Sequence, residues 1–193
     1  MLSLLIRNLV FTVVVPGLGG AWVPAWLLTR DGGPAGHGAV PVAWEAVPVI
    51  AAGAALYLWC AWNFAAVGRG TPGPWDAPRR VVAHGPYRRV RNPIYLAALL
   101  VVLGEAGLFG SLRLLAYAGV LAVCFHLFVI GYEEPALRRR FGPAYLAYRD
   151  AVPRWIPDLY RPPYEGGSLQ RRLLMKAAPY AGGGTTGAGK SRV

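Results

Sequence analysis

Four runs of apolar residues constrain this chain more than any other feature of its sequence. They extend from about Leu9 to Leu28, Val47 to Val67, Ile94 to Phe109 and Leu114 to Tyr132. A helix needs about 17–25 mostly apolar residues to cross a bilayer, so three of the runs are long enough and the third fits as a shorter, tilted partner. Since 55% of the 193 residues are hydrophobic and only 15% are charged, the sequence predicts an all-α bundle of about four membrane-spanning helices.

The first run has the position of a secretory signal peptide but not its composition. Arg7 is its only early positive charge, and prolines and glycines interrupt the apolar stretch at positions 16, 17, 19, 20 and 24. A membrane helix tolerates such residues, whereas a signal peptide combines a basic start with an apolar core. We therefore expect a retained, kinked helix.

The basic residues lie mainly in two segments, between the second and third runs and after the fourth. The net charge is +11, from 20 Lys and Arg against 9 Asp and Glu, and the opposite loops hold only Arg30 and Arg113. The positive-inside rule then predicts an integral protein of the cytoplasmic membrane with cytoplasmic N- and C-termini. No soluble basic module remains, so membrane lipids rather than nucleic acid are the expected partners of these charges.

The C-terminal part of the chain differs in composition from the rest. Residues 1–161 form the expected membrane-embedded domain, and residues 162–193 form a basic, Gly-rich tail that we expect to be disordered. Gly184 to Ser191 fits the phosphate-loop pattern GxxxxGK[ST], but no buried strand precedes it and no helix follows. That loop works between a strand and a helix, so nucleotide binding is not predicted.

The cysteines do not predict a metal site. Cys60 and Cys124 both lie inside apolar runs, with no CxxC or Cys/His spacing. Buried small hydrophobic residues fit this pattern, so neither a metal nor a disulfide framework is expected.

The segment that leads into the third run carries the first group of residues suited to chemistry. Asn92 precedes Pro93, which predicts that Asn92 caps the helix and Pro93 occupies its first turn. The free amides and dipole of a helix N-terminus favour an anionic group such as a carboxylate. Tyr87 and Tyr95 offer aromatic faces beside it, although interfacial anchoring is an alternative role for both.

Two adjacent carboxylates, Glu133 and Glu134, stand where the fourth run ends. Successive helical residues point about 100° apart, so the two side chains can address different partners. A cofactor with an aromatic base, a carboxylate, an amine and a positive centre would suit the two segments together.

Two stretches, GPYRRVRNPIY (85–95) and EEPALRRRFGPAYLAYRDAVPRWIP (133–157), resemble the isoprenylcysteine carboxyl methyltransferase and phospholipid methyltransferase family. These are integral membrane enzymes that use S-adenosylmethionine, and the resemblance covers roughly residues 68–157. It implies a cofactor pocket lined by Val82, Tyr87, Pro93 and Tyr95, with Glu133 holding the cofactor.

Two positions depart from the pattern of these relatives. Asn92, which we include among the cofactor-binding residues, stands where several of them have histidine, and its amide can donate and accept but cannot shuttle a proton. Val129 stands where the isoprenylcysteine branch has an arginine that contacts substrate, and the Gly-x-Gly of the phospholipid branch has no clear match. We expect a lipophilic acceptor that enters from the bilayer, first an isoprenylcysteine-type carboxylate. Phospholipid N-methyl transfer, small-thiol S-methyl transfer and a non-catalytic membrane scaffold stay open.

Two residues are candidates for catalysis. An amine acceptor would need a base, for which Glu134 is the candidate. His126 precedes Glu133 by seven positions, two turns along the helix and about 10 Å away, where it would border the acceptor site or accept its proton. The alternative for His126 is a hydrogen bond to a neighbouring helix. The expected reaction is an in-line methyl displacement that depends mainly on positioning and on exclusion of water.

Overall fold

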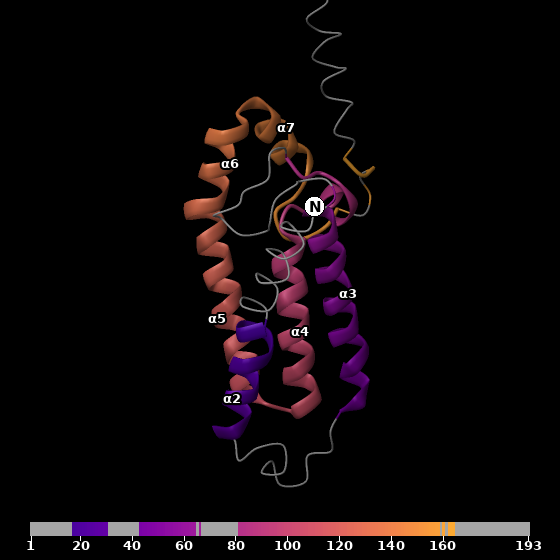
Figure 1. The fold of residues 1–193 in the computed structure, drawn as a ribbon, viewed down its shortest axis with the longest axis vertical. Coiled ribbons are helices and arrows are strands. Elements are labelled where there is room, and N and C mark those ends of the chain that lie inside the picture. The colour runs from indigo at the N-terminus through magenta and orange to yellow at the C-terminus, as the bar shows by residue number, and fades with distance from the viewer. Residues whose placement is uncertain are drawn as a thin grey trace, which may run out of the picture.

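The structure is a computed structural model that describes residues 17–30, 43–64, 66, 81–158, 160 and 162–164, and these are mainly helical with no β-strand among them. Figure 1 shows most of the helices running along the long axis of the molecule, with the last helical elements of the chain at one end. The helices are α2 (Val23–Arg30), α3 (Val47–Asn63), α4 (Pro93–Phe109), α5 (Leu112–Phe128), α6 (Glu134–Phe141) and α7 (Pro143–Ala151). Short turns of other helix types are η1 (Leu18–Trp22), η2 (Trp44–Ala46), η5 (Gly85–Arg88) and η6 (Val129–Glu133).

Two helical stretches are long and apolar enough to cross a membrane, Trp44–Asn63 with 20 residues and Leu112–Phe141 with 30. Only 17% of the apolar window in each is buried inside the protein, so both present their apolar side chains outward, unlike the core helix of a soluble domain. Pro93–Phe109 is apolar but shorter. The predicted all-α membrane protein is confirmed with two candidate spans. A bundle of four spans stays a prediction, because part of the first run lies outside the described residues.

α3 and α4 pack through two glycines that let their backbones approach. A methyl group at Gly53 would lie 2.9 Å from the Ala97 carbonyl oxygen, and one at Gly104 would lie 2.6 Å from a side-chain carbon of Ile50. Small residues at such positions are typical of close helix pairs in membranes. This contact fixes α4 against α3.

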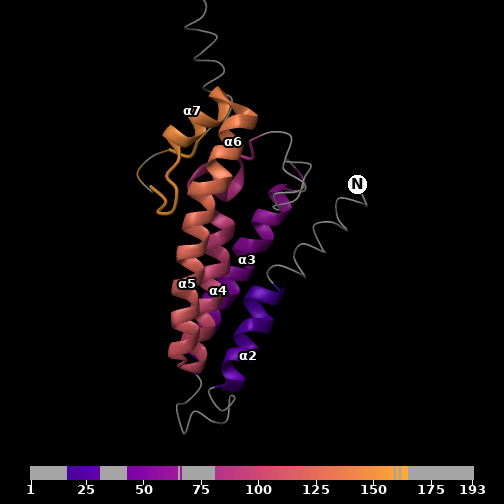
Figure 2. The same cartoon turned by 90° about the vertical axis from the view of Figure 1, so that its left-hand side faces the viewer.

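A tight connection then turns the chain from α4 into α5. Gly110 ends α4 in the left-handed conformation with φ 58°, and its N–H donates to carbonyls of the last turn. Ser111 caps α5, because its hydroxyl accepts a hydrogen bond from the Leu114 amide at 3.3 Å. α5 therefore runs back antiparallel to α4, beside it in Figures 1 and 2.

The continuous helix from Leu112 to Phe141 is longer than a membrane is thick. At about 1.5 Å per residue its 30 residues extend about 45 Å, against about 30 Å of hydrocarbon. About 20 residues from Leu112 complete the crossing, so Glu133, Glu134 and α6 lie beyond the spanning segment. Between α5, which makes up most of the spanning segment, and α6 lies η6, a π-helical turn over Val129–Glu133.

At this end of the bundle, two loops and α7 form a small packed unit. Ala83, Tyr145, Tyr148 and Val152 are buried together. The Tyr148 hydroxyl donates to the Tyr87 carbonyl at 2.8 Å, which ties α7 to the loop before α4. This unit therefore holds the loop before α4 close to the end of α5.

The start of the predicted tail also belongs to this unit. The Tyr164 amide donates to the Arg88 carbonyl at 3.1 Å, and its ring lies 5.4 Å from that of Tyr148. Packed structure thus continues past residue 161. Residues 165–193, including the phosphate-loop pattern at Gly184 to Ser191, lie outside the described residues.

Candidate functional site

A cavity of about 470 Å³ lies where α3, the end of α5, α6 and α7 meet the loop before α4. Sites for small molecules commonly have about 300–1,000 Å³. The residues that line it are Phe64, Val81, Val82, Tyr87, Arg91, Tyr95, Phe128, Tyr132, Glu133, Ala136, Leu137, Arg139, Arg140, Phe141, Tyr145 and Tyr148. Four predicted cofactor residues, Val82, Tyr87, Tyr95 and Glu133, are thus brought together in one wall.

Glu133 presents a carboxylate to this cavity. The Tyr95 hydroxyl from α4 donates to Glu133 Oε2 at 2.8 Å. Among the described residues, no cationic side chain forms an ion pair with Glu133. The carboxylate is therefore oriented by a neutral donor, the Tyr95 hydroxyl.

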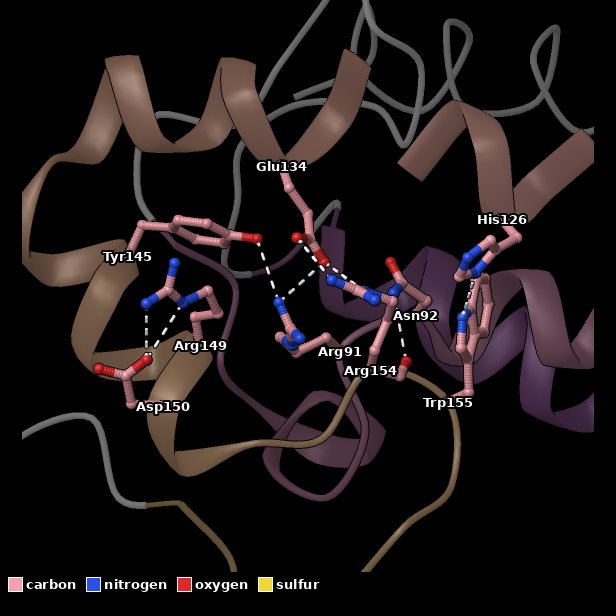
Figure 3. A network of polar contacts seen from close by, with 9 residues as sticks. All are labelled: Arg91, Asn92, His126, Glu134, Tyr145, Arg149, Asp150, Arg154 and Trp155. Atoms are coloured by element: carbon pink, nitrogen blue, oxygen red, sulfur yellow. Dashed lines mark hydrogen bonds and ion pairs between the residues drawn. The ribbon is translucent and has the colours of Figure 1, made fainter. Parts of the chain in front are cut away.

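Glu134 makes quite different contacts from its neighbour (Figure 3). Its carboxylate accepts hydrogen bonds from Arg91 Nη1 at 2.9 Å and from Arg154 Nε and Nη2 at 2.6 and 3.0 Å. Burial alone would raise the pKa of Glu134, but the Arg154 hydrogen bond and the charges of Arg91 and Arg154 outweigh it and hold the pKa below its ordinary value. The prediction that the two carboxylates address different partners is confirmed. An ionised carboxylate shared by two arginines is poorly placed to act as the base proposed from the sequence.

Asn92 and Pro93 lie beside the cavity but not in its wall. α4 begins at Pro93 as predicted, yet Asn92 makes no capping hydrogen bond. Its Nδ2 donates instead to the Arg154 carbonyl at 3.2 Å. Asn92 therefore holds the N-cap position of α4, as predicted, but its side chain binds the loop after α7 and makes no hydrogen bond to the first amides of the helix.

His126 also lies outside the cavity wall. Trp155 Nε1 donates to His126 Nδ1 at 3.1 Å, and the Trp155 ring centre lies 6.4 Å from that of Tyr95. Figure 3 places the His126–Trp155 pair to one side of the Glu134 cluster. Tyr95 connects the two regions, since it contacts Trp155 with its ring and Glu133 with its hydroxyl.

Tyr87 lines the cavity, but its hydroxyl is buried from water on the side of Cys60. Its hydroxyl is buried and has no hydrogen-bond partner of ordinary geometry within the described part of the chain. Its ring packs edge-on against Phe64 with centres 5.4 Å apart. Burial raises the pKa of Tyr87 well above its usual value, so the group stays a neutral donor.

Arg139 and Arg140 belong to the basic segment after the fourth apolar run, whose charge by itself predicts only membrane topology and lipid contact, but both line the cavity together with Arg91. A signal for Arg140 was present in the spacing, since it follows Glu133 by seven residues, two helical turns. The cavity thus offers one unpaired carboxylate, several guanidinium groups and aromatic faces. That set is suited to a zwitterion with an aromatic ring.

Comparison with known proteins adds an independent finding. The family model described as phospholipid methyltransferase matches residues 43–144. Searches of curated proteins and of solved structures gave no match. The matched region covers more than half of the chain and contains the predicted residues from Val82 to Glu134. The chain belongs to the phospholipid methyltransferase family of membrane methyltransferases.

Proposed function

We propose that the chain transfers a methyl group from S-adenosylmethionine to a lipophilic acceptor that carries a carboxylate, of the isoprenylcysteine type. The observation that carries the proposal is the position of Glu133, whose carboxylate lines the cavity and accepts a hydrogen bond from Tyr95. Among the described residues, no cationic side chain forms an ion pair with it. When bound, S-adenosylmethionine supplies an electrophilic methyl group on a positively charged sulfur.

The residues in the cavity wall fit this cofactor. Glu133 would bind a cationic part of it, and Arg139 and Arg140 would bind its carboxylate. Phe64 and Tyr87 offer aromatic surface for its base. These side chains would bind, orient and shield the reacting groups from water.

Neither of the two residues predicted to be catalytic is free to act as a base in the cavity, which supports a carboxylate acceptor. Glu134 is paired with Arg91 and Arg154, and the Nδ1 of His126 accepts the indole proton of Trp155. Neither side chain lines the cavity. A carboxylate is already ionised at neutral pH, whereas an amine or thiol must first lose a proton. A carboxylate acceptor therefore needs no proton to be removed by any of the described residues.

A phospholipid amine is the second candidate, and one specific observation favours it. The matching family model is described by its phospholipid acceptor, and the arginines of the cavity would bind a phosphate as readily as a carboxylate. The amine would then have to reach the site already deprotonated.

Binding of the demethylated cofactor tests the first step. Calorimetry on purified protein should detect S-adenosylhomocysteine at micromolar affinity, and Glu133→Ala should abolish the signal. Asp150→Ala is the matched control, because Asp150 is a carboxylate on α7 with 67% of its side chain exposed. Folded wild-type protein that binds no cofactor would overturn the enzyme proposal.

Transfer of labelled methyl tests the acceptor. Protein, methyl-labelled cofactor and a lipid extract should give a product that releases its label in base, as a methyl ester does. A base-stable amine would replace the first acceptor class with the second. Label in neither product, despite cofactor binding, would favour the scaffold alternative.

A further inference from the structure

The segment that follows α7 turns back along α5 toward the middle of the molecule, as Figure 2 shows. Its deepest side-chain contact is the 3.1 Å hydrogen bond from Trp155 to His126. His126 precedes Tyr132 by six residues, which is about 9 Å along the helix axis. Residues 152–158 therefore extend alongside the apolar part of this helix, past the position at which that apolar part ends.

The height of the membrane can be judged from the aromatic residues of α3. Trp44 and Trp62 are 72% and 67% exposed, and 18 residues separate them. That corresponds to about 27 Å along a helix, close to the thickness of the hydrocarbon layer. Tryptophans at both ends are typical of the two membrane interfaces. On α5 the same thickness runs from Leu112 to about Ile130, which places His126 inside the layer.

The surface around this contact is apolar and faces outward. Val123, Leu127 and Ile130, which neighbour His126 on the helix, are 59%, 58% and 39% exposed. Ile156, next to Trp155 in the loop, is 82% exposed. In water these side chains would form an unfavourable patch, whereas in a bilayer they continue the lipid-facing surface of α5.

Some polar groups of the loop have partners within the protein, whereas the amides of Trp155 and Ile156 make no hydrogen bond to another described residue. Pro153 and Pro157 have no N–H to satisfy. The Pro153 carbonyl accepts from the Arg91 amide at 2.9 Å, and the Arg154 carbonyl accepts from Asn92. The Arg154 charge is paired with Glu134. Irregular backbone is not tolerated in the hydrocarbon centre, so the contact with lipid is one of side chains at the edge of the layer, where water and headgroups can still reach the free amides.

We propose that residues 152–158 form a re-entrant membrane contact, in which Trp155 and Ile156 insert among lipid acyl chains and His126 holds Trp155 at that depth. The partner is the hydrocarbon of the leaflet on the Glu133 side. This contact goes beyond methyl transfer and does not depend on it. Tyr95 contacts Trp155 with its ring and Glu133 with its hydroxyl. The proposed lipid contact and the cavity are therefore separated by the side chain of Tyr95.

A spin label at position 156 tests the depth directly. The variant Ile156→Cys is made in the full chain with Cys124→Ala, since Cys124 is exposed while Cys60 is buried. The Cys124→Ala protein alone should take up no label. Collision rates with oxygen, which concentrates in lipid, and with a water-soluble nickel chelate are measured in phosphatidylcholine nanodiscs. Leu127→Cys gives the lipid reference and Asp150→Cys the aqueous reference.

The proposal expects the label at 156 to match Leu127→Cys, with frequent oxygen and rare nickel collisions. A label that matches Asp150→Cys would overturn it, and so would one shielded from both reagents, which indicates a protein partner. A second measurement requires no cysteine. Brominated acyl chains should quench wild-type fluorescence more strongly than that of Trp155→Phe, and equal quenching contradicts the insertion.

The role of His126 is tested by two substitutions in the Ile156→Cys background. His126→Leu removes the acceptor of the indole proton and should move the label toward the aqueous reference. His126→Gln keeps an acceptor oxygen and should restore the depth. An unchanged depth in His126→Leu would overturn the positioning role of His126.

Discussion

The hydroxyl of Tyr95 on α4 donates to Glu133 at the end of η6, with 2.8 Å between the two oxygens. This bond joins two helices at the cavity and fixes the orientation of a carboxylate that has no cationic partner among the described residues. Tyr95→Phe should weaken binding of S-adenosylhomocysteine about tenfold, because a hydrogen bond to a charged group contributes about 1.5–3 kcal/mol. Calorimetry measures it, and the fully exposed Tyr160 provides the control Tyr160→Phe. Equal loss in both variants would contradict the specific role.

Glu134→Gln should lower stability more than Glu133→Gln. The Glu134 substitution leaves Arg91 and Arg154 without their counter-charge, and removing one partner of a largely buried pair costs about 3 kcal/mol, less where water screens Arg154. Glu133→Gln breaks no ion pair with a described residue and should instead abolish cofactor binding. Thermal unfolding in detergent and calorimetry separate the two effects. A Glu134→Gln protein of wild-type stability would argue against the arginine cluster.

The stability of the wild-type protein should fall at acidic pH because of Glu134. The folded state holds the pKa of Glu134 below its ordinary value of 4.5, so its contribution is complete above that value and is lost as the pH falls through the lowered pKa. Glu134→Gln removes this dependence. Unfolding midpoints of both proteins across the acidic range should therefore converge as the pH falls. A constant difference would contradict the pairing.

Gly104→Ala should loosen the contact between α3 and α4. The added methyl group would lie 2.6 Å from a side-chain carbon and 3.0 Å from the backbone nitrogen of Ile50, and overpacking of this kind costs about 1–3 kcal/mol. Gly119→Ala on α5 is the matched control, since nothing lies within 4 Å of its added carbon. That change should stabilise the helix by up to about 1 kcal/mol. Unfolding temperatures that move in the same direction would contradict the packing.

Local signals in the sequence predicted the start of α4 at Pro93 and the separate roles of the two carboxylates. They did not predict what Asn92 contacts, because the capping rule considers only the next turn, while its amide binds the Arg154 carbonyl 62 residues away. The pairing of Glu134 with two arginines also depends on a loop that returns from α7. Such long-range contacts leave no periodic pattern in the chain.

The cavity arginines were missed for a different reason. A cluster of positive charge after a membrane helix is well explained by topology alone, so Arg139 and Arg140 required no further role. Only the arrangement of α6 against α7 and the loop before α4 shows that they share a cavity with Glu133. Val82 was identified by resemblance alone, whereas Tyr87 and Tyr95 were also indicated by their aromatic rings beside the start of α4.

The π-helical turn at Val129–Glu133 has a consequence for insertions and deletions in this helix. Such a turn contains one residue more than an α-helical turn needs. Deletion of Gly131, which is exposed and has open space around it, would remove that additional residue, so the turn could close as ordinary helix with little rotation of the part that follows. The membrane-crossing part would keep its length and its apolar surface. Glu133 and Glu134 would keep their side of the helix, whereas the same deletion in the α-helical part of α5 would rotate both by about 100° away from Tyr95 and the arginines. The π-helical turn is therefore where this helix can lose a residue without changing the angle between its anchoring half and its binding half.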